Sequence, residues 1–177
     1  MPRLIIALLL LGACAQAPVR QGYRLANAPI YSSAVLETAR LEGRWVQVAV
    51  YQPPTAARCP APRLTLEPQS GDGLALSGQL CAPDLQNVKT MLRPTGPGRF
   101  VASRPIAAGL DGPWWVLWVD TDYRTVLIGS PDGKFGFVLN RTEALPDDRR
   151  RAVLELLDWN GYDPEGLRFL TPGRGSP

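Results

Sequence analysis

The sequence contains no histidine. Histidine is the commonest general base near neutral pH and the commonest protein ligand of zinc and haem iron, so its absence argues against hydrolytic triads, metal centres and haem sites. We expect no metal site and no cofactor. An excess of charge of one sign is also lacking, because 19 basic and 16 acidic residues are interspersed and leave a net charge of +3. With no basic stripe interleaved with aromatics, we expect no nucleic-acid partner.

Long hydrophobic runs are missing as well. The apolar run at residues 4–11 is too short to span a bilayer. It follows Arg3 and precedes two small residues, Gly12 and Ala13. This arrangement is typical of a secretory signal peptide, which we place at residues 1–13.

The residues that end this segment, Leu-Gly-Ala-Cys at 11–14, resemble the bacterial lipobox. The resemblance implies that the Cys14 thiol carries a diacylglycerol and that Cys14 is the first mature residue. Two acyl chains give stable membrane attachment. Because Ala15 follows where an aspartate would favour the inner membrane, we expect the periplasmic face of the outer membrane. An ordinary signal peptide with an incidental cysteine is the alternative.

Residues 14–34 have no sustained apolar period and predict a tether.

Cysteine is scarce, and Cys59 and Cys81 are the only two left once Cys14 is assigned to lipid. Residues 63–67 and 74–78 have the pattern of two strands joined by a turn. The midpoint of the cysteine pair is residue 70, inside that turn, so the two thiols lie nearly opposite each other in an antiparallel hairpin. In an oxidising compartment this predicts a disulfide. A reactive thiol is the alternative, but no histidine or motif is present to activate it.

Glycine or proline punctuates the middle of the chain about every eight to twelve residues, and the segments between are rich in valine, leucine, aromatics and threonine. This pattern indicates an all-β fold. Sequential strands with tight turns favour an eight-stranded antiparallel up-and-down barrel, because closure removes the exposed edges of an open sheet. The predicted strands are 43–52, 62–67, 74–81, 86–93, 98–103, 113–120, 124–130 and 134–141.

One helix is predicted after the strands, from Pro146 to a stop at Gly161. Val153, Leu156 and Leu157 share one of its faces, which we expect to pack on the outside of the barrel. Residues 149–151 are three arginines and are expected to be solvated. A short strand is predicted at 167–170. The folded domain is predicted to span 35–171 and to be followed by a flexible tail at 172–177.

Three motifs resemble the signature of the lipocalin family, in the family's order and followed by its helix. They are Gly43-Arg44-Trp45 at the start of the first strand, Thr121-Asp122-Tyr123 after the sixth, and Arg141 at the end of the eighth. The resemblance covers residues 36–170 and is greatest to bacterial outer-membrane lipocalins and apolipoprotein D-like proteins. It implies a lipocalin barrel in which Arg141 lies across the ring of Trp45 at the closed end, as a cation–π contact.

A barrel of this size can hold one small molecule in its interior. In the eighth predicted strand the alternation separates bulky from smaller side chains, and we take the bulky face as inward. For the predicted strands at 113–120 and 124–130, the inward face is the one that the resemblance to lipocalins implies. The predicted ligand-binding residues are Trp114, Val116, Trp118, Leu127, Gly129, Phe135, Phe137 and Leu139.

Such an apolar wall suits an acyl chain better than a sugar or a nucleotide. We therefore predict binding, storage or transport of a fatty acid, lysophospholipid or similar apolar molecule at the outer membrane, by a protein that is not an enzyme. One alternative is an isomerase- or epoxidase-like lipocalin in which a carboxylate such as Asp120 carries the proton chemistry. Another is a structural envelope lipoprotein with a filled barrel that acts through a protein partner. Whether the barrel forms a homodimer is left open.

Overall fold

A computed structural model describes residues 19–104, 106 and 109–170. The predictions for the signal peptide at 1–13, for Cys14 and for the tail at 172–177 fall outside these residues. Among the residues that it describes, no helix is long and apolar enough to cross a bilayer.

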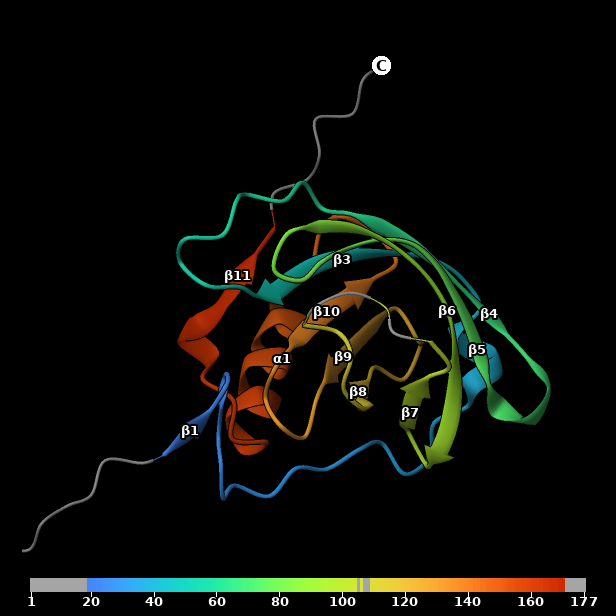
Figure 1. The fold of residues 1–177 in the computed structure, drawn as a ribbon, viewed down its shortest axis with the longest axis horizontal. Coiled ribbons are helices and arrows are strands. Elements are labelled where there is room, and N and C mark those ends of the chain that lie inside the picture. The colour runs from blue at the N-terminus through green and yellow to red at the C-terminus, as the bar shows by residue number, and fades with distance from the viewer. Residues whose placement is uncertain (1–18, 105, 107–108, 171–177) are drawn as a thin grey trace, which may run out of the picture.

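Eight consecutive strands form a closed antiparallel barrel (Figure 1). Each strand pairs with the next along the chain, and β10 pairs with β3 to close the circle. This confirms the predicted barrel. The strands are β3 (Gly43–Tyr51), β4 (Arg63–Pro68), β5 (Leu74–Cys81), β6 (Leu85–Gly96), β7 (Arg99–Ala102), β8 (Trp114–Val119), β9 (Thr125–Gly129) and β10 (Gly136–Asn140).

The antiparallel order divides the connections between two ends of the barrel. The turns at 69–73, 97–98 and 120–124 lie at one end with the 3-10 helix η1 (Thr38–Leu41), and we call this the closed end. The turn at 69–73 contains a second 3-10 helix, η2 (Ser70–Asp72). The connections at 52–62, 82–84 and 130–135, with the described parts of 103–113, lie at the other end, which we call the mouth. The single helix therefore leaves the barrel at its closed end, where β10 finishes.

Alternation along the strands gives the barrel two apolar faces. On β10, Phe137 and Leu139 belong to the interior cluster, whereas Val138 belongs to a second cluster on the outer wall. The outer cluster is covered by α1 (Asp147–Trp159), as predicted, with Val153 and Leu157 fully buried. A 3-10 turn, η3 (Pro164–Gly166), then leads to β11 (Leu167–Phe169), which pairs with the end of β3.

Of the three arginines at the start of α1, Arg150 and Arg151 are exposed, as predicted, whereas Arg149 is half-buried. The Arg149 guanidinium donates hydrogen bonds to the Thr125 hydroxyl at 2.6 Å and the Asn140 side-chain oxygen at 2.9 Å. The Arg150 guanidinium lies 3.6 Å from the centre of the Phe169 ring. These contacts tie the helix to β9, β10 and β11, so part of the arginine stretch serves to dock the helix.

The N-terminal segment differs most from its prediction. Within the predicted tether, residues 19–34 lie against the barrel and include a small hairpin of β1 (Arg20–Gln21) and β2 (Arg24–Leu25). Arg24 is buried, and its guanidinium donates hydrogen bonds to backbone carbonyls of Ala28, Pro29, Pro131 and Asn160. Arg24 thus joins the N-terminal segment to the end of α1 and to the β9–β10 turn. The composition of the segment gives no sign of such distant partners.

Candidate functional site in the barrel interior

The candidate site is the interior of the barrel towards the mouth, where three aromatic rings meet. Trp114 from β8 lies 5.4 Å from Phe135 and 5.3 Å from Phe137, and the two phenylalanine rings are 6.1 Å apart, all between ring centres. The Trp114 indole N–H is paired internally, with the Leu110 carbonyl at 3.0 Å. Of the predicted lining set, five residues do face the interior: Trp114, Val116, Phe135, Phe137 and Leu139.

The prediction that Trp118 lines the interior is wrong. Along β8 the pairing register shifts between Val116 and Trp118, which indicates a bulge. A bulge inserts one extra residue and reverses the phase of the side chains that follow. Trp118 therefore packs with the outer cluster, beside Leu117, and Val119 turns inward in its place.

The assignment of Leu127 and Gly129 to the interior is also wrong. Leu127 lies in the outer cluster, whereas Val126 and Ile128 face inward. The register explains this, because Ile128 is paired with the inward Phe137 and paired residues share a face. At Gly129 a β-carbon would lie 2.7 Å from the buried Tyr162 hydroxyl, so this glycine makes room for Tyr162 on the outer side.

A larger part of the interior wall comes from strands that the prediction of the site did not use. Alternating leucines on β4 and β5 point inward together with Leu92 of β6, and Leu41 of η1 closes the base. The pattern Leu-x-Leu in 64–66 and 74–76 was the signal that could have found them. The interior residues that sequence reasoning missed include Leu41, Leu66, Leu74, Leu76, Leu92, Phe100, Val126 and Ile128.

The side chains fill the interior almost completely. The cavity that remains is about 20 Å³ and is lined only by apolar side chains. A space of this size corresponds to about one water molecule. A bound acyl chain would therefore require the surrounding side chains to move outward.

One polar side chain on the inner face has no partner. Thr90 is paired in register with Leu76, which lines the cavity, and is itself 7% exposed. Among the described residues its Oγ1 atom is the one buried side-chain oxygen or nitrogen without a hydrogen bond. A buried hydroxyl without a partner costs free energy, so Thr90 offers a hydrogen bond to a ligand atom.

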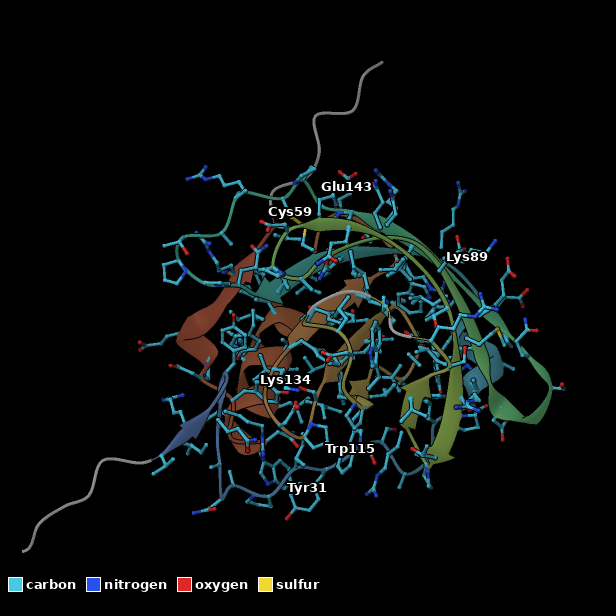
Figure 2. All side chains as sticks on the ribbon, in the orientation of Figure 1. Tyr31, Cys59, Lys89, Trp115, Lys134 and Glu143 are labelled. Atoms are coloured by element: carbon cyan, nitrogen blue, oxygen red, sulfur yellow. A yellow bond between two sulfur atoms is a disulfide. The ribbon has the colours of Figure 1, made fainter. Side chains whose placement is uncertain are left out.

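The mouth is crossed by hydrogen bonds and a disulfide. Cys59 and Cys81 are joined, with 6.3 Å between their α-carbons, which confirms the predicted pairing (Figure 2). The buried Gln47 side chain donates to and accepts from the Cys81 backbone, at 3.1 and 2.8 Å. The Gln52 amide donates to the Pro83 carbonyl. The loop at 52–62 and the end of β5 are therefore fastened together over the interior.

The closed end carries the residues of the three sequence motifs. The Arg141 guanidinium lies 3.7 Å from the centre of the Trp45 ring and donates hydrogen bonds to the Arg40, Arg44 and Tyr123 carbonyls. The Trp45 indole N–H is bonded to the Leu41 carbonyl at 2.8 Å. A β-carbon at Gly43 would come within 3.2 Å of the Arg141 guanidinium, which explains the glycine there.

The Thr121-Asp122-Tyr123 turn is held from both sides. The Thr121 carbonyl accepts from Arg40, whose guanidinium also lies 4.0 Å from the centre of the Tyr123 ring. Asp122 pairs with Arg124 at 2.8 Å. Tyr123 adopts a left-handed backbone conformation, with φ of 56°. These residues close the barrel and do not face the interior cavity.

Asp120 belongs to the same turn. Burial alone would raise its pKa, but hydrogen bonds from the Thr125 N–H and from the side chain and N–H of Arg124, with the charge of Arg124, hold the pKa below its ordinary value. A carboxylate held in its charged form by its own turn is a poor acid or base for chemistry inside the barrel. Its surroundings favour a structural role.

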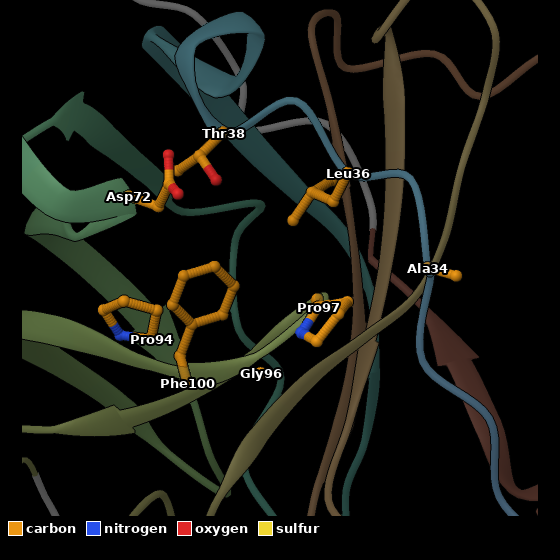
Figure 3. A pocket seen from close by; sticks show the side chains of 9 residues that line it. Ala34, Leu36, Thr38, Asp72, Pro94, Gly96, Pro97 and Phe100 are labelled. Carbon is orange, nitrogen blue, oxygen red and sulfur yellow. The ribbon is translucent and has the colours of Figure 1, made fainter.

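Several recesses lie outside the interior, and two of them flank it at its two ends. A recess of about 410 Å³ at the closed end lies between the N-terminal segment and the β6–β7 turn, and Leu36, Thr38, Asp72 and Phe100 are among its lining residues (Figure 3). Phe100 also lines the interior cavity, so its ring separates the two spaces. Beside the disulfide at the mouth end, a recess of about 270 Å³ is lined by Gln52, Arg58, Cys59, Arg168, Phe169 and Leu170.

Comparison with known proteins agrees with this geometry. Residues 99–172 match the model of the lipocalin-like domain. A segment of 66 residues is 33% identical to temperature-induced lipocalin-1 of Arabidopsis thaliana, and covers 37% of this chain and 35% of the plant protein. The match thus spans about a third of that relative.

Solved structures are similar over most of the barrel. Apocrustacyanin C2 is 15% identical with a TM-score of 0.58, and the alignment covers 78% of this chain and 81% of that one. The siderocalin Ex-FABP is 16% identical with a TM-score of 0.58, over 77% and 97% of the two chains. The similarity shows a shared fold. The family match, the curated relative and the solved structures therefore agree on a lipocalin-like fold.

Proposed function

We propose that this protein is a lipocalin, that it binds an amphiphile with an acyl chain, such as a fatty acid or a lysophospholipid, inside its barrel, and that it stores or transports the amphiphile in the cell envelope. The proposal rests mainly on the lining of the interior cavity, which is entirely apolar. Burial of apolar surface is the dominant source of affinity in such a site. This is a binding function, without a chemical step.

The chain would enter from the mouth. Leu110, Trp114 and Phe135 pack together at that end of the interior, and they are the side chains that an entering chain would displace. The ligand's methylenes would then replace contacts that these side chains make with one another. Because apolar contacts are exchanged for apolar contacts, the displacement costs less than opening the same space to water.

The polar end of the ligand has two candidate partners. Within the barrel, the unpaired Thr90 hydroxyl can bond to a carboxyl or ester oxygen. At the mouth end, Arg58 and Arg168 line one recess. Neither arginine takes part in an ion pair among the residues that the structure describes. Their charge favours an anionic head group such as a carboxylate or phosphate.

We further propose that Cys14 carries a diacylglycerol and holds the protein at the periplasmic face of the outer membrane. The support is the lipobox-like Leu-Gly-Ala-Cys sequence after an apolar run of signal-peptide length. Replacing Cys14 with serine should release the protein from membranes. Retention of Cys14→Ser at the wild-type level would contradict the lipid anchor.

The nearly filled interior favours a second candidate, a structural lipoprotein that acts through a protein partner. Native extraction followed by mass spectrometry of bound small molecules separates the two functions. The binding function predicts an acyl amphiphile in roughly one-to-one ratio with the protein, a ratio that follows from a single interior site. A barrel that carries no small molecule, and takes up none when lipids are added, would contradict it and favour the structural role.

A further inference from the structure

The packed N-terminal segment limits how far the barrel can stand from the membrane. Val19 is the first described residue, and five peptide steps separate it from Cys14. A fully extended chain of that length spans at most about 17 Å. If Cys14 carries the lipid, as proposed above, the barrel must lie close to the bilayer surface with the side that holds Val19 towards it.

This side of the molecule is at the mouth end. The backbone N–H of Tyr23 donates to the Gly133 carbonyl in the β9–β10 turn at 2.8 Å. The Tyr162 hydroxyl is bonded to the Ser130 and Phe135 carbonyls of the same turn. Figure 1 shows β1 beside the part of the chain that contains α1. The chain therefore leaves the barrel beside one of the loops that frame the mouth.

An exposed aromatic pair lies next to this point. Trp159 is 69% exposed and Tyr31 is 55% exposed, and their ring centres are 6.2 Å apart. Both are held in place, because the Tyr31 N–H is bonded to the Asn160 side chain and the Leu25 N–H to the Gly161 carbonyl. Val19 is 72% exposed, and its carbonyl accepts a hydrogen bond from the Ala26 N–H, next to the Leu25–Gly161 bond.

We infer that Trp159, Tyr31 and Val19 form a membrane-contact patch that rests in the interfacial region of the bilayer and turns the mouth towards the lipid surface. Tryptophan and tyrosine favour the membrane–water interface, because one part of each ring system is apolar and the other can bond to water or head groups. The short link to the anchor keeps the patch at a high effective concentration beside the bilayer. A small apolar patch is therefore sufficient to hold the barrel in one orientation on the membrane. An acyl ligand could then pass between bilayer and barrel without crossing a long stretch of water.

Quenching of tryptophan fluorescence by brominated phospholipids tests the orientation. The full-length protein, matured with its own leader in a Gram-negative host, is reconstituted into vesicles of phosphatidylcholine brominated near the head-group end of the acyl chain. We expect the wild-type fluorescence to be quenched and most of this quenching to be lost in Trp159→Phe. The matched control is Trp159→Phe with Ser70→Trp, which moves an exposed tryptophan to the closed end, where we expect no quenching.

The outcomes separate this inference from the lipid anchor. If Cys14→Ser is released but wild type and Trp159→Phe are quenched equally, the anchor stands and the patch is wrong. If the tryptophan at position 70 is quenched as strongly as Trp159, the orientation is reversed. If Cys14→Ser stays on the membrane like the wild type, the anchor and the limit on distance both fail. If two copies of the protein can be cross-linked through the surface around Trp159, and brominated lipid does not quench Trp159, the patch belongs to a dimer interface and the membrane contact is wrong.

Discussion

Arg141 and Trp45 stack on each other at the closed end and join the end of β10 to the start of β3. Trp45 is fully buried, and Trp45→Ala should lower the free energy of unfolding by about 3–5 kcal/mol. Arg141→Ala should lower the free energy of unfolding by a smaller amount, because the guanidinium is only partly buried. The stacking contact with Trp45 accounts for about 1–2 kcal/mol of that loss.

Chemical denaturation of the two single variants and the double variant checks this prediction. If the two residues share one contact, the free energy of unfolding should fall by less in the double variant than the sum of its decreases in the two single variants. Strict additivity would show that the stacking contributes nothing.

Asp120 predicts a dependence of stability on acid pH. Its folded-state pKa lies below the ordinary value, so the stability that it contributes is fully present above the unfolded-state pKa, near 4, and is lost as the pH falls through the folded-state pKa. Asp120→Asn should lower the free energy of unfolding at pH 7, by about 1–3 kcal/mol for the lost charged hydrogen bonds, and weaken the acid dependence. Denaturant titrations between neutral pH and pH 3 measure both effects.

Asp122→Asn is the matched control, because Asp122 is exposed on the same turn. We expect it to change the stability by no more than a few tenths of a kcal/mol. An Asp120→Asn variant that matches wild type at every pH would refute the role given to the Asp120 hydrogen bonds.

At the scale of elements, the disulfide joins the loop after β3 to the end of β5. The bridge closes a loop of 22 residues, which in the chain-entropy model stabilises the fold by about 3 kcal/mol. Replacing Cys59 and Cys81 together with alanine should therefore lower the free energy of unfolding by about this amount, and reduced wild-type protein should fall to the same level. Equal stability of the oxidised wild type and the double variant would contradict this estimate.

The sequence predicts the barrel and helix well, because alternation, turn residues and helix signals are local. The phase of β8 could not be predicted in the same way, since the bulge before Trp118 is set by pairing with β9. The face of Leu127 likewise follows from its register against β10. The position of Arg24 depends on carbonyl groups more than 100 residues away in the chain, and nothing in residues 19–34 encodes those partners locally.

At the scale of the whole molecule, two substitutions on β8 test which face meets the ligand. Val116→Glu places a charge without a partner in the apolar interior and should abolish binding of an acyl chain or raise the pKa of the new carboxyl. Trp118→Glu, two residues away on the outer face, should bind nearly as well as wild type. Circular dichroism confirms that each variant is folded. Loss of binding in Trp118→Glu alone would place the ligand on the outer wall.

The most direct test of the acyl-binding account is a titration of the delipidated protein with saturated fatty acids from octanoate to palmitate, followed through Trp114 fluorescence or calorimetry. Each added methylene that is buried contributes about 0.8 kcal/mol, so the affinity should rise about fourfold per carbon until the interior is full. Affinities that do not change along the series would show that the head group alone is bound, and would contradict the proposal that the apolar interior holds the chain.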